Sequence, residues 1–256
     1  MIDSIFEKIK IRKMILIYIS AIIFTFVILK IPFFQYIYIK DKYFGEVILN
    51  MLLVIWFYIT LSKENTAIKS KVINYISKVN YKKIFYLYVL NLGIYIGTGL
   101  CILIGDKPLS KVPSGMYIIF GITLAPIVEE LIFRGVVMNR LKIKLGIIPA
   151  IFFSAAIFGI LHFDLNILGR LLFGILSAML YIETKNIINC VILHILHNTS
   201  ILIFPAVSQY TNFSIDTYSE FKVGLLVLIV FSCFILSIVF NIIYIKNNLP
   251  RKNNIL

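Results

Sequence analysis

The chain has 256 residues, of which 60% are hydrophobic and only 14% are charged, and its mean hydropathy is +0.96. Charged residues make up about 25% of an ordinary soluble domain, so this composition excludes that class and indicates an integral membrane protein. The net charge of +13 does not imply nucleic acid, because lysine and arginine collect on the cytoplasmic loops of membrane proteins and face anionic lipid. We therefore expect the lipid bilayer as a partner and no nucleic acid. The abundance of isoleucine, lysine and asparagine is typical of a bacterial coding sequence rich in A and T.

Eight long apolar runs predict eight membrane helices. The runs are apolar nearly all round, which favours helices over the alternating strands of a membrane barrel. The first follows a short basic head but is too long for the core of a signal peptide. The expected fold class is therefore all-α, a polytopic bundle of about eight transmembrane helices in one membrane domain of residues 1–256. The runs lie at about 14–34, 44–61, 84–104, 113–138, 146–163, 165–182, 187–204 and 223–245.

Three cysteines, Cys101, Cys190 and Cys233, lie within these runs, and no two of them are spaced as a CxxC pair. Cysteines in such surroundings behave as small buried hydrophobes. They predict neither a disulfide nor a cysteine metal site.

Charges in the connecting segments indicate the orientation. Lysine and arginine are concentrated between runs two and three, between runs four and five, and in the tail, whereas the other connections also carry acidic residues. The positive-inside rule then predicts a multi-pass cell-membrane protein with both termini in the cytoplasm. In residues 62–83, apolar side chains recur at near-helical spacing among the lysines. Two alternatives stay open there: an amphipathic helix on the inner leaflet or a solvated basic loop.

The fourth run carries adjacent carboxylates, Glu129 and Glu130, and an arginine, Arg134. Each such charge near the centre of a membrane helix costs roughly 2.5–3.5 kcal/mol, so by default it marks function. Glu130 and Arg134 are four residues apart and share a helix face, where they can pair. Glu129 points about a hundred degrees away and can meet another helix as a general base. Pro126 can kink this helix toward a wet cavity.

The three histidines of the chain, His162, His194 and His197, all fall in apolar runs. They could simply hydrogen-bond helices together, but a polar site shared with the fourth run is the stronger interpretation. A carboxylate and a histidine can activate water, while an imidazole N–H and the amide of Asn198 can stabilise an oxyanion. The same residue types are ordinary zinc ligands, although the sequence contains no HExxH motif.

Three motifs occur in the order found in one family: Glu-Glu-x-x-x-Arg at 129–134, Phe-x-x-x-His at 158–162 and His-x-x-x-Asn at 194–198. This pattern resembles the CPBP (Abi) family, which includes CAAX prenyl protease type 2 and bacteriocin-processing or immunity proteins. The likeness covers about residues 113–205, the expected CPBP-like core. It implies an intramembrane endopeptidase with an eight-helix α-bundle.

The resemblance also implies a role for each motif residue. Glu129 and His162 would activate the attacking water, and His194 with Asn198 would stabilise the oxyanion. Glu130 and Arg134 would support the site. Members of the family have been described both as metalloproteases and as glutamate-dependent proteases, so no cofactor is certain. A divalent metal such as zinc would be held by Glu129, His162 and His194. His197 lies outside the pattern and is expected to be a packing residue.

Several functions remain as alternatives. Eukaryotic relatives cut prenylated CAAX tails, whereas for a bacterial chain we expect a leader peptide, a pheromone precursor or a membrane protein as substrate. The alternative is a non-enzymatic immunity or sensor-regulating protein that acts by binding. A proton-coupled transporter also uses buried glutamate, histidine and arginine, but the chain lacks the paired half-helix repeats of that class.

The expected depths of Glu129 and His162 in the membrane conflict with a shared site. If the cytoplasmic side lies at Arg140 in the fourth helix, Glu129 is roughly 16 Å from it at helical rise. His162 is roughly 24 Å from the cytoplasmic start of the fifth helix by the same measure. The two groups meet only if the fifth helix starts deeper or is tilted, or if Pro126 bends the fourth.

Overall fold

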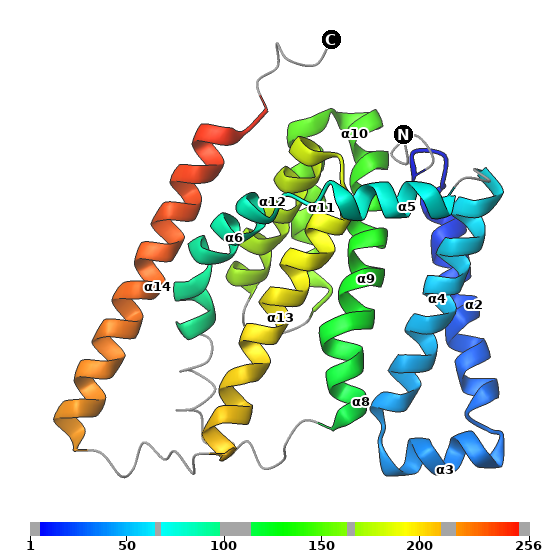
Figure 1. Cartoon of the computed structure of the whole chain (residues 1–256), viewed down its shortest axis with the longest axis horizontal. Helices are drawn as coiled ribbons and strands as arrows, with labels where there is room; N and C mark the ends of the chain where they lie inside the picture. The colour runs from blue at the N-terminus through cyan, green and yellow to red at the C-terminus, as the bar shows by residue number, and fades with distance from the viewer. Residues whose placement is uncertain (1–5, 65–67, 98–113, 163–166, 211–218, 251–256) are drawn as a thin grey trace.

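The structure is a computed structural model, and it describes residues 6–64, 68–97, 114–162, 167–210 and 219–250. Every regular element in these residues is helical, and most of the helices run side by side as a bundle (Figure 1). The segments η1 and η2 are π-helical. The elements are α2 (Ile11–Ile28), α3 (Pro32–Lys40), α4 (Tyr43–Glu64), α5 (Ile68–Ser77), α6 (Tyr81–Leu90), α8 (Gly115–Ile118), η1 (Ile119–Leu124), α9 (Ala125–Glu130), η2 (Leu131–Met138), α10 (Asn139–Leu145), α11 (Ile147–Ile160), α12 (Ile167–Thr184), α13 (Ile187–Tyr210) and α14 (Glu220–Asn248).

Among the described residues, five helices are long and apolar enough to cross a membrane: α2, α4, the α8–α10 rod, α12 and α14. Two more apolar helices, α11 and the described part of α13, are shorter. The predicted all-α membrane bundle is confirmed. Two predicted spans need correction. The first run does not continue to residue 34, because α2 ends at Ile28 and Pro32 starts the separate helix α3. The third run is helical at 81–90 and 92–97, and its last part lies outside the described residues.

The charged run forms one continuous rod from Gly115 to Leu145, in which π-helical turns alternate with α-helical ones (Figure 1). Pro126 lies in the first turn of α9, between η1 and η2. A proline inside a helix removes one backbone hydrogen bond and crowds the preceding turn. The wider π turns absorb this locally, and such turns are frequent at functional sites. The two carboxylates therefore lie in a short α-helical segment with a π-helical segment on either side.

A helical hairpin explains how Glu129 and His162 reach the same depth in the bundle. The rod extends through α10 to Leu145, and Gly146, at φ +87°, turns the chain directly into α11. Glu129 lies 16 residues before Leu145, and His162 lies 16 residues after Gly146. The two arms are equally long, so the two side chains reach the same level. The expected helix end near Arg140 was wrong because the basic residues 140–144 are themselves helical.

Residues 68–77 form the helix α5, which lies across one end of the bundle, roughly perpendicular to the long helices (Figure 1). Its apolar residues Val72, Ile73 and Ile76 are exposed in the isolated chain. The Asn186 side chain donates to the Tyr75 carbonyl at 2.8 Å and fastens the helix to the bundle. Of the two alternatives for this segment, the structure has the amphipathic helix.

The main core lies where α11, α12 and α13 meet, with Phe158, Phe173 and Leu176 almost fully buried. Helices α11 and α12 approach closely at Gly174, where an added Cβ would lie 2.9 Å from the Cβ of Ala155. This close approach carries the polar residues of α12 against the charged rod.

Candidate active site

Glu130 is the centre of a buried polar cluster that three helices contribute to. Its carboxylate is 0% exposed. Oε2 forms an ion pair with Arg134 Nε at 3.1 Å and accepts a hydrogen bond from Ser177 Oγ at 2.9 Å. Oε1 contacts His194 Nδ1 at 2.8 Å. A carboxylate without any contact with solvent needs such polar partners in place of water.

Arg134 makes further contacts besides its ion pair with Glu130. Its guanidinium lies over the rings of Phe158 at 4.8 Å and Phe173 at 5.8 Å. Nη2 donates to the Gly174 carbonyl at 3.3 Å. Stacked, buried arginine is well suited to fixing a carboxylate, because its planar group keeps one orientation. The predicted pairing of Glu130 with Arg134 is therefore present in the structure.

The hydrogen bonds of both histidines fix which ring nitrogen carries a proton. His162 Nδ1 lies 2.7 Å from the Phe158 carbonyl oxygen, which can only accept, so Nδ1 is the donor. His194 Nδ1 faces the Glu130 carboxylate in the same way. In each ring, Nε2 is thereby left to face the reaction site.

Glu129 faces these two Nε2 atoms. Its Oε2 is 3.5 Å from His162 Nε2 and 3.7 Å from His194 Nε2. This oxygen is itself shielded from solvent and has no hydrogen-bond partner among the described residues. Separations of this size suit a shared water molecule better than direct hydrogen bonds. The structure thus brings together Glu129, His162 and His194 from three helices.

A groove of about 510 Å³ opens onto this point. Glu129, His162 and Phe133 form one wall, and the opposite wall is apolar and comes largely from α2, including Tyr18. Glu46 and further residues of α4 complete it. The groove gives Glu129 and His162 an approach from outside the bundle, while Glu130 and Arg134 stay buried behind them.

The two remaining polar residues of α13 lie differently. Asn198 donates a side-chain N–H to the Gly121 carbonyl at 2.7 Å, which ties α13 to η1. His197 is 2% exposed, stacks on Phe173 at 4.5 Å and meets Tyr95 edge-on at 4.8 Å. His197 therefore packs in the core behind the site, as its place outside the motif pattern indicates.

Two contributors are missing from the expected set, Ser177 and Arg170, both on α12. Ser177 gives no signal in the sequence, since a serine in a small-residue run is ordinary in membrane helices. Arg170 does give a signal, because it is a charge inside the predicted sixth run. It interacts electrostatically with Glu129 in the structure.

The sequence does not decide whether the site holds a metal ion. Glu129 Oε2 and the two Nε2 atoms are the donor types that zinc takes. Among the described residues, however, no three His, Cys, Asp or Glu side chains are arranged so that they could hold a metal ion. We derive no step through a metal.

Comparison with known proteins adds an independent observation. Residues 112–200 match the family described as type II CAAX prenyl endopeptidase Rce1-like. The chain is also similar to a protein of Bacillus subtilis (strain 168) named "Putative membrane peptidase YdiL", with 36% identity over 89 residues. That match covers 34% of this chain and spans only 36% of the length of the relative. No solved structure matches the chain. The matched residues contain all three motifs, so both comparisons agree with the resemblance to the CPBP family that the motifs indicate.

Proposed function

We propose that the protein is an intramembrane endopeptidase that hydrolyses a peptide bond in a membrane-associated peptide or protein. The observation that carries this proposal is the convergence of Glu129 Oε2 with the Nε2 atoms of His162 and His194 within 3.7 Å, beside a groove that Glu129 and His162 line. The match to an endopeptidase family over the same residues supports it.

Glu129 and His162 serve as the pair that activates water. A water molecule between Glu129 Oε2 and His162 Nε2 meets two acceptors, since the Nδ1 proton of His162 is committed to the Phe158 carbonyl. As the water attacks the scissile carbonyl, Glu129 takes its proton as general base. A positioned base of this kind contributes about 10²–10⁴-fold to the rate.

His194 and Asn198 stabilise the negative oxygen that forms. The Glu130 carboxylate, 2.8 Å from His194 Nδ1, fixes the orientation of the ring, as an acidic residue does behind a catalytic histidine. When Nε2 carries a proton, it donates a hydrogen bond to the oxyanion. Asn198 has a second amide hydrogen besides the one that it donates to Gly121. Glu130, Arg134 and the remaining partners act by positioning His194.

The groove sets the class of substrate. Its walls are largely apolar, and one of them belongs to the membrane-crossing helix α2. An extended peptide that is itself held in or at the membrane can enter from the side and present its backbone to Glu129. We propose a membrane-associated precursor as the substrate, and a multi-pass membrane protein with both termini in the cytoplasm as its protease.

The glutamate-dependent form is the one proposed, because the water activation described here needs only side chains of the chain itself. Purified protein that has been incubated with a strong chelator and then desalted should keep its full activity. A loss that zinc restores would establish the metalloprotease form instead, with Glu129, His162 and His194 as the ligands.

Comparative membrane proteomics tests the function in cells. Cells that carry Glu129→Gln in place of the wild type should accumulate a membrane-associated precursor. The matched control is Glu183→Gln, which removes a carboxylate at the end of α12, where it pairs with Lys83 at 2.9 Å, outside the site. If Glu129→Gln cells are indistinguishable from wild type, and keep the cellular phenotype, the non-enzymatic binding function replaces this proposal.

A further inference from the structure

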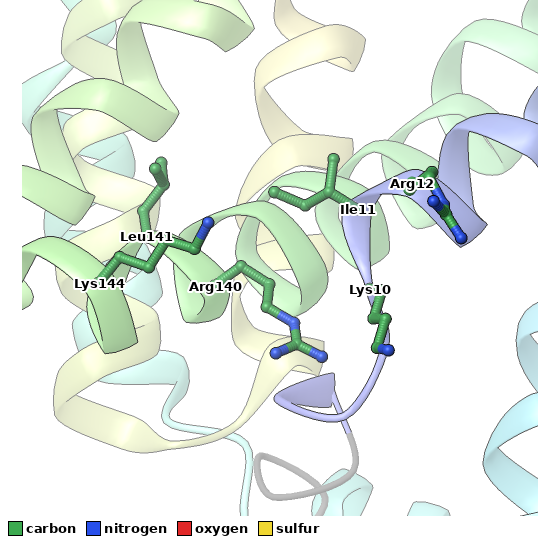
Figure 2. A pocket seen from close by; sticks show the side chains of 6 residues that line it. All are labelled: Lys10, Ile11, Arg12, Arg140, Leu141 and Lys144. Atoms are coloured by element: carbon green, nitrogen blue, oxygen red, sulfur yellow. The ribbon is translucent and has the colours of Figure 1, made fainter.

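A second pocket lies at the end of the bundle where α2 starts, away from the groove. It has a volume of about 380 Å³ and is lined by six described residues, of which four are cationic and two aliphatic. Figure 2 shows them: Lys10, Ile11, Arg12, Arg140, Leu141 and Lys144. None of the catalytic candidates lines it. Nothing in the proposed peptidase mechanism uses these charges.

Four cationic side chains border the pocket, whose inner surface is almost entirely apolar. No lining residue is acidic, and Glu7, an acidic residue nearby in the sequence, is paired with Lys142 at 2.8 Å. Figure 2 shows the side chains of Lys10 and Arg140 projecting in the same direction, with Lys144 at the opposite edge of the pocket from Arg12. Cations held together in this way repel one another, and an anion between them relieves the repulsion.

The start of α2 adds to the attraction. Lys10 is the N-cap residue of this 18-residue helix, its side chain makes no capping hydrogen bond, and the first turn has no acidic residue. The first N–H groups of a helix have no partner within it, and the helix dipole favours negative charge there. A phosphate group is the natural ligand of such an end when lysine and arginine surround it.

The apolar surroundings select a lipid over a free anion. Ile11 begins a membrane-crossing helix, so the pocket lies at the level where that helix enters the bilayer. Ile15 and Leu16, further along α2, and Ile143 on α10 are about half exposed. Acyl chains can cover these side chains while the headgroup meets the cations. Basic pockets between membrane helices bind anionic headgroups in this manner.

We propose that this pocket binds the headgroup of an anionic phospholipid, which ties the start of α2 to α10. Arg140 already bridges the two elements, because its Nε donates to the Ile9 carbonyl at 2.8 Å. Since α2 also forms a wall of the catalytic groove, the bound lipid holds that wall in place. The inference depends on the pocket alone and not on peptidase activity.

Competition binding in uncharged detergent tests it on the purified full chain. A fluorescent short-chain phosphatidylglycerol is bound and then displaced by unlabelled dioctanoyl phosphatidylglycerol, dioctanoyl phosphatidylcholine or inorganic phosphate. Phosphatidylglycerol should compete at least about 10-fold better than either of the others, since each cation near a membrane surface strengthens binding several-fold. Equal competition by phosphatidylcholine would overturn the anion site, and equal competition by inorganic phosphate would overturn the assignment to lipid.

Matched variants locate the site. Lys10→Gln/Lys144→Gln should weaken phosphatidylglycerol binding roughly 10–30-fold, whereas Lys78→Gln/Lys82→Gln, two exposed lysines outside the pocket, should change it less than about 2-fold. Arg140 is left intact because of its structural hydrogen bond. If the double variant does not fold, the single Lys144→Gln protein should still show about a 5-fold loss. Equal losses in the two pairs would show general surface attraction and contradict the proposal.

Discussion

Removing Arg134 should destabilise the protein more than any surface change, because it strands a buried charge. Arg134 and Glu130 are 1% and 0% exposed and form an ion pair at 3.1 Å. Arg134→Met keeps the volume but removes the cation that is paired with the buried carboxylate, and removing one partner costs about 3–5 kcal/mol in buried pairs. For a chain of this size, that corresponds to a fall in Tm of roughly 6–20 °C. The loss of stacking on Phe158 and Phe173 acts in the same direction.

A thiol-reactive dye can report this unfolding. Cys190 is 0% exposed, and its Sγ contacts the Ser177 carbonyl at 3.3 Å, next to the cluster. In a Cys101→Ser/Cys233→Ser background, Cys190 is the remaining thiol of the chain, which has three cysteines. Dye labelling on heating then follows the opening of the region around the site.

A double variant separates charge from packing. Glu130→Gln/Arg134→Met removes both charges and should recover part of the stability that the single Arg134→Met protein loses, since replacing both partners is far less costly than removing one. If Arg134→Met melts within about 2 °C of the background protein, the ion pair does not hold the buried cluster together, and the argument that Glu130 and Arg134 position His194 fails.

Three smaller predictions follow from individual contacts. Ser177→Ala removes the hydrogen bond to Glu130 at 2.9 Å and should lower stability by about 1 kcal/mol and peptidase activity by roughly 10-fold; unchanged activity would show that this bond does not position the carboxylate. His197→Phe should keep activity within about 3-fold, because the histidine stacks in an aromatic core; an inactive, folded variant would make it part of the reaction. Gly135→Ala places a Cβ 2.8 Å from the ring of Phe6 and should cost about 1–3 kcal/mol through overpacking, read from the melting curve.

The sequence predicts the fold more completely than it predicts the site. Hydropathy predicts the bundle and the described helices that carry apolar runs, because membrane length and backbone satisfaction leave few alternatives. Hydropathy does not predict where the helices end. The basic stretch 139–145 reads as a loop, yet it continues the rod, and only Gly146 with its positive φ marks the turn.

Within the site, the local pairing of Glu130 and Arg134 follows from helical spacing. The contact between Glu130 and His194 does not, since the residues are 64 positions apart and on different helices. No periodicity links them: polar residues in several apolar runs indicated a shared site, but not which two side chains make contact. The sequence does not predict the role of Ser177 either. Its hydrogen bond to Glu130 depends on how closely α12 packs at Gly174.

The central claim is that Glu129 drives hydrolysis of a membrane-held peptide bond. Membranes from cells that carry Glu129→Gln contain the uncut substrates, and they can be incubated with purified wild-type or Glu129→Gln protein in detergent micelles. Amine labelling and mass spectrometry then identify newly formed peptide N-termini. We predict a small set of new N-termini, close to membrane segments, with the wild-type protein and at least about a 10²-fold lower yield with the variant. Equal yields from the two proteins, or no new N-termini from either, would contradict the claim.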